Sequence, residues 1–258
     1  MKKRMRKGQV TLFIIIAIVI VAIALFIFLF PRIKTIFVPS TPNLQLKDCI
    51  SKGVTDALAL VSKHGGSINP VNAIMYQDSK IEYLCYTNQY YQTCINQQPL
   101  LKQHIEREIL DYIKPAVDKC YDDLRTSLEG RGYSVSGRND ISVSIEPNKV
   151  KIILPGVTVT KEATESYNKI EASYDSQIYN LIMLSNSILN WEARYGDSDI
   201  TTYMLYYPNV KVEKYKQEDG SKIYILTDRN TKDKFVFATR SLSWPAGYGI
   251  GLTFKPTS

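Results

Sequence analysis

The sequence lacks the short motifs that mark many catalytic and nucleotide-binding sites. It contains no Gly-x-Ser-x-Gly, His-Glu-x-x-His or Gly-x-x-x-x-Gly-Lys segment. Histidine is scarce, with only His64 and His104 in 258 residues, and neither forms a His/Cys dyad in a plausible context. No Asn-x-Ser/Thr sequon occurs, so N-glycosylation at that motif is not expected. These absences favour a noncatalytic protein.

Metal-ligand spacing is missing as well. The intervals between the four cysteines, Cys49, Cys85, Cys94 and Cys120, are 36, 9 and 26 residues, unlike the C-x-x-C spacing of many structural zinc sites. The segment from His104 to Glu108 begins like a zinc-binding helix but has no second histidine. We therefore expect no metal and no cofactor, and we expect His104 to be packed or partly exposed.

The chain has one long hydrophobic run, the twenty uncharged residues from Thr11 to Phe30. A helix that rises about 1.5 Å per residue would cross the roughly 30 Å hydrocarbon core over that length. A cleavable signal has a shorter apolar region and a small-x-small exit, and neither feature is present. A buried soluble helix is the alternative, but the run has no polar face. It predicts a transmembrane helix over residues 9–30 that anchors the protein in the lipid bilayer.

The charge distribution sets the orientation of this helix. Five basic and no acidic residues precede it: Lys2, Lys3, Arg4, Arg6 and Lys7. This pattern predicts a cytoplasmic leader over residues 1–8 and an extracytoplasmic C-terminal domain. Removing these five from the 32 basic residues leaves 27 against 25 acidic residues, so the net charge falls from +7 to +2. Because the basic excess lies beside the membrane, we expect no nucleic-acid partner.

The residues Lys7, Gly8, Gln9 and Val10 stand directly before the apolar run. Over about the first thirty residues the sequence resembles the class III signal of archaeal type IV pilin-like surface proteins. In that family a membrane-embedded aspartyl peptidase cuts after the glycine on the cytoplasmic side. The resemblance therefore implies cleavage between Gly8 and Gln9, and it implies an archaeal cell-surface location. The alternative is that Gly8 simply ends the basic segment of an ordinary anchor.

Two features depart from the pilin pattern. Many pilins carry a glutamate where this sequence has Phe13, and their helix continues into the head domain, whereas this one meets Pro31. The same class of signal occurs on archaeal surface-anchored binding proteins outside filaments. Both a filament subunit and an isolated tethered protein stay open, with other envelope or pilus proteins as expected partners.

A stalk over residues 31–43 is predicted by Pro31, Pro39 and Pro42. The domain over residues 44–258 then begins with two amphipathic helices, predicted over Leu46–Val61 and Leu100–Leu128 from apolar spacings of three and four. Pro115 is expected to kink the second helix and Gly130 to end it.

All four cysteines lie beyond the anchor, where an even number predicts disulfides in an oxidising compartment. Cys49 and Cys120 fall on the apolar faces of the two helices, which predicts one bridge. Cys85 and Cys94 lie in two predicted short strands, Lys80–Thr87 and Tyr90–Ile95, which predicts a second. The chain-entropy model assigns roughly 4 kcal/mol to the longer loop and roughly 2.7 kcal/mol to the shorter one.

The second half changes period. Alternating apolar residues predict a hairpin over residues 141–154, with a neighbouring strand from Tyr133 and a continuation past Pro155. A helix is predicted over about Tyr174–Tyr195, with a start as early as Glu162 as the alternative. Strands over 210–215, 222–227 and 235–238 follow. Because helices and hairpins come in separate blocks, we expect an α+β fold with about three helices and mostly antiparallel strands. A subdivision near residue 132 is an alternative to one outer domain.

Tyrosine is in excess, with 18 residues that include Tyr206 and Tyr207 near the later strands. They favour either a sugar-stacking or protein-binding surface or ordinary half-buried strand packing. The leading hypothesis is a noncatalytic, membrane-anchored surface protein with an outer domain for binding or assembly. The contrasting hypothesis is an extracytoplasmic hydrolase, which requires a pocket with two carboxylates about 5–10 Å apart.

Overall fold

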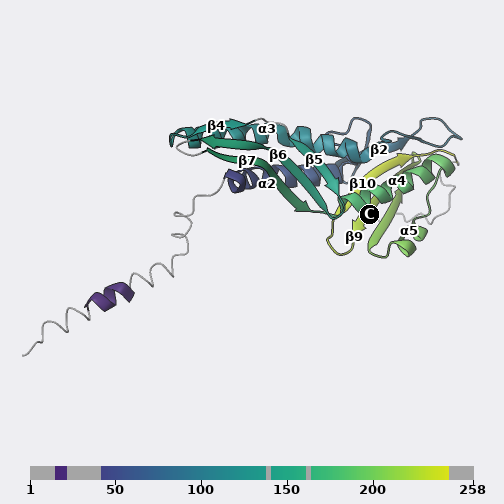
Figure 1. Ribbon diagram of the computed structural model, residues 1–258. Helices are drawn as coiled ribbons and strands as arrows, with labels where there is room; N and C mark the ends of the chain where they lie inside the picture. The colour runs from purple at the N-terminus through teal and green to yellow at the C-terminus, as the bar shows by residue number, and fades with distance from the viewer. Residues whose placement is uncertain (1–14, 22–41, 138–140, 161–163, 244–258) are drawn as a thin grey trace, which may run out of the picture. The chain divides into compact units, whose positions relative to one another are not determined.

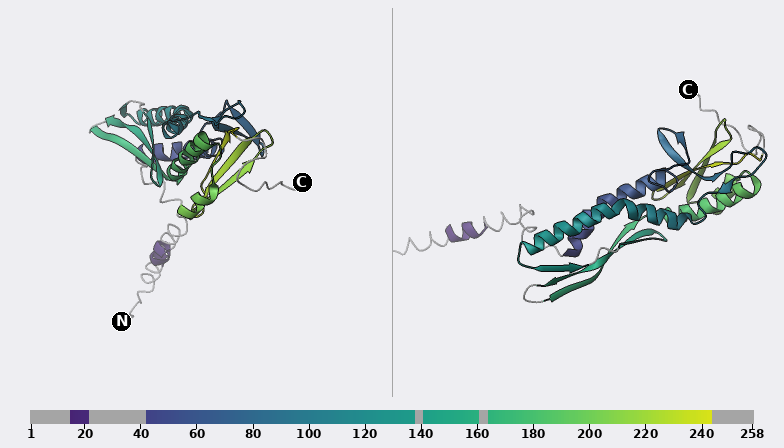
Figure 2. Two further views of the ribbon diagram at one scale, coloured as in Figure 1. Left: turned by 90° about the vertical axis from the view of Figure 1, so that its right-hand side faces the viewer. Right: turned by 90° about the horizontal axis from the view of Figure 1, so that it is seen from above.

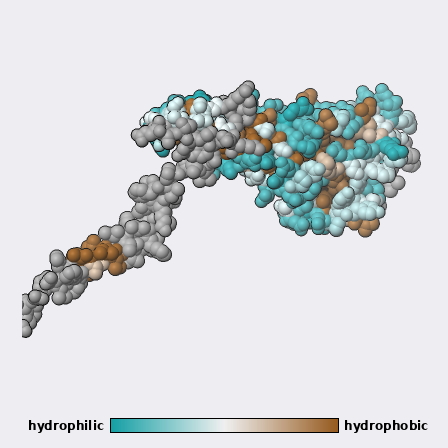
Figure 3. Space-filling view, viewed as in Figure 1, coloured by the Kyte–Doolittle hydropathy of each residue, from teal (hydrophilic) through white to brown (hydrophobic). Residues whose placement is uncertain are grey.

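The computed structural model describes residues 15–21, 42–137, 141–160 and 164–243 (Figure 1). The chain divides into two compact units, Met1–Pro42 and Asn43–Ser258. Residues 15–21 form a helical segment whose hydrophobic side chains are exposed, visible as a brown patch in Figure 3. No helix among the described residues is both long and apolar enough to cross a membrane. The predicted leader with Gly8 and Gln9, and most of the predicted anchor and stalk, lie outside the described residues.

The second unit is an α+β domain with mostly antiparallel sheets, as the sequence predicts. Its helices are α2 (Pro42–Lys63), α3 (Leu101–Glu129), α4 (Ile178–Tyr195) and α5 (Ile200–Tyr206). Its strands are β1 (Ala73–Tyr76), β2 (Ser79–Tyr86), β3 (Ile95–Asn96), β4 (Ser134–Gly137), β5 (Ser142–Glu146), β6 (Lys149–Thr160), β7 (Thr164–Asp175), β8 (Val210–Lys216), β9 (Ser221–Asp228) and β10 (Lys234–Arg240).

The first sheet has the order β1-β2-β10-β9-β8, and β3 pairs with β2. Adjacent strands in this sheet are antiparallel, except β2 and β10, which are parallel. Helix α4 covers this sheet and contacts β10, β9 and β2. Tyr224 and Leu226 of β9 are buried in the main core together with Phe235 and Phe237 of β10. Ile223, one position away on β9, belongs to a smaller cluster with Ile81 and Tyr83, as the two-residue period of a strand requires.

The second sheet is built on the twelve-residue strand β6. One edge of β6 pairs with β7 along its length, and the other pairs first with β5, from Lys149 to Ile153, and then with β4, from Val157 to Thr160. Pro155 lies between these two pairings, where its missing N–H costs no hydrogen bond on that edge. Helix α3 contacts β4 and β5, and the views in Figure 2 show its long axis running beside this sheet.

The helices α2 and α3 pack antiparallel. Cys49 near the start of α2 is bonded to Cys120 near the end of α3, and Gly66 just after α2 faces Leu101 and Ile105 at the start of α3. Buried α3 side chains recur at intervals of three and four and form one face: Leu101, Ile105, Ile109, Ile113, Val117, Cys120, Tyr121 and Leu124. The helix continues through Pro115 to Glu129.

Five details differ from the expectations drawn from sequence. Residues 164–175 form strand β7 instead of the early part of a helix, because they pair along β6. Strand β1 and helix α5 were not expected. The strand predicted over Tyr90–Ile95 is reduced to Ile95–Asn96, and α2 begins at Pro42, inside the predicted stalk. Proline is tolerated in the first turn of a helix, because its missing N–H would have no partner within the helix there. Helix α2 can therefore begin at Pro42.

Candidate functional site

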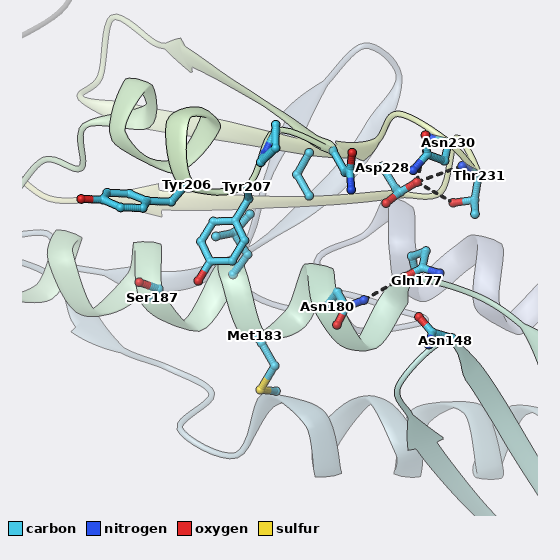
Figure 4. Close-up of a pocket in the computed structure, with 14 residues that line it drawn as sticks. Asn148, Gln177, Asn180, Met183, Ser187, Tyr206, Tyr207, Asp228, Asn230 and Thr231 are labelled. Atoms are coloured by element: carbon cyan, nitrogen blue, oxygen red, sulfur yellow. Dashed lines mark hydrogen bonds between the residues drawn. The ribbon is translucent and has the colours of Figure 1, made fainter.

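The described residues enclose a cleft of about 590 Å³ at the N-terminal half of α4. This volume lies within the usual range for ligand pockets, about 300–1,000 Å³. The cleft is lined by α4, by the segment after α5, by the β9–β10 turn and by the β5–β6 turn (Figure 4). Its residues are Asn148, Gln177, Asn180, Met183, Leu184, Ser187, Tyr206, Tyr207, Pro208, Asn209, Val210, Asp228, Asn230 and Thr231.

Backbone hydrogen bonds hold the segments around the cleft. The N–H of Gln177 donates to Asp233 Oδ2 at 2.6 Å, which ties the start of α4 to the β9–β10 turn. The N–H of Ser176 donates to the carbonyl of Asn148 at 3.1 Å, and this carbonyl lies in the β5–β6 turn. Asn148 has φ of +66°, a conformation that asparagine adopts more readily than most residues. These bonds therefore hold the start of α4 against the two turns that line the cleft.

The wall above α4 comes from the residues that end α5. Asp199 begins α5 by accepting a hydrogen bond from the N–H of Thr201 at 2.9 Å. That bond, together with one from the Thr202 hydroxyl, lowers the pKa of Asp199. The hydroxyl of buried Tyr203 lies 3.1 Å from Ser187 Oγ on α4. In Figure 4 the ring of Tyr207 projects toward α4, whereas the ring of Tyr206 points sideways, away from Tyr207.

The lining combines apolar side chains with mostly uncharged polar ones. Among the described residues that line the cleft, only Asp228 carries a charge. Its Oδ1 atom accepts the N–H groups of Asn230 and Thr231, both at 2.9 Å. The carboxylate thus shapes the β9–β10 turn. The hydrolase hypothesis required two carboxylates in one pocket, and this lining supplies one.

A buried ionic cluster lies near the other end of α4, outside the cleft. Glu192 is fully buried and accepts hydrogen bonds from Lys222 Nζ at 2.7 Å and from the hydroxyl of Tyr224. Burial, followed by the negative charge of Glu192, raises the pKa of Tyr224 far above its usual value. Lys222 also contacts Asp197 at 3.3 Å, and Asp197 pairs with Lys214 at 2.8 Å. These charges are paired with one another, and the cluster connects the end of α4 to β8 and β9.

A second polar cluster joins the end of α2 to β2 and α3. Ser67 Oγ donates to Glu82 and lies 2.8 Å from Nε2 of His104. Burial raises the pKa of Glu82, although the Ser67 hydrogen bond and the charge of His104 oppose that rise. Glu108 accepts the N–H of Ile68 at 2.7 Å. His104 is thus half-buried and hydrogen-bonded. No group of three or more His, Cys, Asp or Glu side chains suited to a metal ion occurs in the described part of the chain.

Both disulfides predicted from the sequence are present. Cys49 is bonded to Cys120 across 71 residues, and Cys85 to Cys94 across 9 residues. They lie in the α2–α3 pair and beside the β2–β3 pairing. Neither bridge lines the cleft. The sequence drew attention to Tyr206 and Tyr207 but not to Asn148, Gln177 or Asn180, because isolated amides at turns and helix starts carry no motif.

Comparisons with protein-family models, with curated proteins and with solved structures found no match to this chain.

Proposed function

We propose that this chain is a noncatalytic, membrane-anchored cell-surface protein whose outer α+β domain binds a ligand in the cleft beside α4. The observation that carries the proposal is the cleft itself, a pocket of about 590 Å³ with exposed tyrosines and amides. Its single carboxylate, Asp228, is occupied by its own turn. A lining of this kind can hold a ligand, and it supplies one carboxylate where a carboxylate-based hydrolase uses two.

The location outside the cell is supported by two independent features. The uncharged run from Thr11 to Phe30 follows a basic segment, which orients the domain outward. The two disulfides fit an oxidising compartment, because the reducing cytosol disfavours such bonds. The resemblance at Gly8 and Gln9 to a pilin-type signal adds a processing step that would leave the helix as the mature N-terminus.

Mass spectrometry of the chain from purified membranes tests this proposal. We expect a mature N-terminus at Gln9, no free thiols, and digestion of the domain by protease added to intact cells. The matched variant Gly8→Val should keep residues 1–8 while remaining in the membrane. An intact Met1 in the unmodified protein would contradict pilin-type processing but not the anchor. A domain protected from external protease, or a cut after Phe30, would contradict the anchored surface location.

A further inference from the structure

The charge of the cleft restricts its ligand. A charged ligand gains most from an unpaired opposite charge in the site, as in an arginine–carboxylate pair. The described lining contains no lysine, arginine or histidine. Asp228 already accepts two backbone N–H groups and, at 3.3 Å, the hydroxyl of Thr231. The lining therefore favours an uncharged ligand over an anion or a cation.

The amides of the cleft indicate which polar groups that ligand carries. Asn180 Nδ2 donates to Gln177 Oε1 at 2.7 Å, which orients both side chains (Figure 4). Among the described residues the side-chain amides of Asn148, Asn209 and Asn230 have no hydrogen-bond partner, and all three residues are exposed. Each amide offers both a donor and an acceptor. A hydroxyl group also does both, so neighbouring hydroxyls match such a lining.

The remaining lining residues offer flat or flexible apolar surface. Tyr207, whose ring projects toward α4 in Figure 4, is 54% exposed. A tyrosine side chain combines an apolar ring, whose face carries negative partial charge, with a hydroxyl at its edge. The C–H-rich face of a sugar ring can pack on such a ring, and the thioether of Met183, 38% exposed, provides adaptable surface nearby.

From these three properties we propose that the cleft binds an uncharged oligosaccharide, with a sugar ring against Tyr207 and hydroxyl groups on the amides of Asn148 and Asn180. The inference rests on the proposed function, because it names the ligand class of the same cleft. A surface protein would meet such chains as glycans of an envelope or of another cell.

Isothermal titration calorimetry with the full-length protein in detergent micelles tests this inference. The probes are cellohexaose, mannohexaose, maltohexaose and chitohexaose as neutral oligosaccharides, with hexagalacturonate as a charged comparison. We expect saturable binding of at least one neutral probe that is tighter than binding of hexagalacturonate. Tyr207→Ala and Asn180→Ala should each raise the Kd by about tenfold, as expected for an aromatic anchor and a hydrogen-bonding residue.

Two matched controls separate the cleft from general effects. Tyr90→Ala and Asn88→Ala remove exposed side chains of the same types from the loop between β2 and β3, outside the cleft, and should leave the Kd unchanged. Circular dichroism should show that every variant is folded. Failure of all four neutral probes to bind, tighter binding of hexagalacturonate, or equal binding by Tyr207→Ala and Tyr90→Ala would overturn the inference. None of these results would alter the membrane location or the N-terminus, which test the proposed function separately.

Discussion

At the scale of residues, helix α4 carries polar side chains with opposite roles. Asn180 faces the cleft, whereas Glu192 is fully buried and satisfied by Lys222 and Tyr224. A buried carboxylate is tolerated only with such partners, because an unpaired charge in the interior costs several kcal/mol. Its partners come from β9, 30 and 32 residues later. The sequence therefore could not reveal the pair, since glutamate on a helix is typical of a solvated face.

Asp197 lies beside this buried pair, 3.3 Å from Lys222, and its own contribution to stability depends on pH. Burial alone would raise its pKa, but the charges of Lys222 and Lys214 outweigh burial, and the pKa is lowered from its usual 3.8. A carboxyl group with a lowered pKa in the folded state stabilises the protein fully above the unfolded value. That contribution is lost as the pH falls through the folded pKa.

We therefore expect Asp197→Asn to lower the free energy of unfolding at pH 7 by about 1.5–3 kcal/mol, the range for hydrogen bonds to charged groups. The difference from the unmodified protein should shrink as the pH falls below 3.8. Urea denaturation at a series of pH values measures both effects. Asp122→Asn is the control, because that side chain is 71% exposed and its contact with Arg125 is long, at 3.7 Å. This substitution should change the free energy of unfolding little. An Asp197 effect independent of pH would contradict the electrostatic explanation.

At the scale of elements, helices with regular apolar spacing were predictable and their junctions were not. The predicted end of α4 at Tyr195 is correct because Gly196 takes the left-handed conformation, with φ of +81°. The start of α4 was predicted too early, because residues 164–175 pair with β6 as strand β7 and the helix begins only at Ile178. The parallel pairing of β2 with β10 joins segments far apart in sequence, so the sequence pattern does not predict it either. Likewise, the cleft joins turns that are far apart in sequence, so its amides could not be grouped in advance.

Two glycines give a matched test of these junctions. A Cβ atom on Gly196 would lie 2.2 Å from Ser243 Oγ and would also be strained by the positive φ. Gly196→Ala should therefore lower the free energy of unfolding by about 2 kcal/mol or more. Gly53 lies inside α2, where a Cβ atom would meet Ala116 and Ile113 at 4.0 Å, an ordinary contact. Gly53→Ala should raise that free energy by about 0.5–1 kcal/mol.

Chemical denaturation of the two variants under nonreducing conditions measures these changes. The opposite signs make the comparison strict, because both substitutions add the same methyl group. A stabilising Gly196→Ala would mean that the turn after α4 can rearrange around the new side chain. A strongly destabilising Gly53→Ala would mean that α2 and α3 lie closer together than the 4.0 Å contacts indicate.

At the scale of the whole molecule, the two disulfides constrain very different lengths of chain. The Cys49–Cys120 bond closes 71 residues that include most of α2, all of β1, β2 and β3, and most of α3. The Cys85–Cys94 bond closes only 9 residues beside β2. If a disulfide acts mainly by limiting the unfolded chain, the long bridge contributes about 4 kcal/mol and the short one about 2.7 kcal/mol.

We expect the double variant Cys49→Ala/Cys120→Ala to lose more stability than Cys85→Ala/Cys94→Ala, as measured by the free energy of unfolding in urea. This order of stability loss tests the loop-entropy explanation, because the loss of buried contacts predicts the reverse order. Cys85 and Cys94 are both buried, whereas Cys49 is exposed, so removing the short bridge leaves the larger loss of buried contacts. A greater loss for the short bridge would show that local packing near β2 outweighs the loop entropy, and the long bridge would then serve mainly to hold α2 against α3.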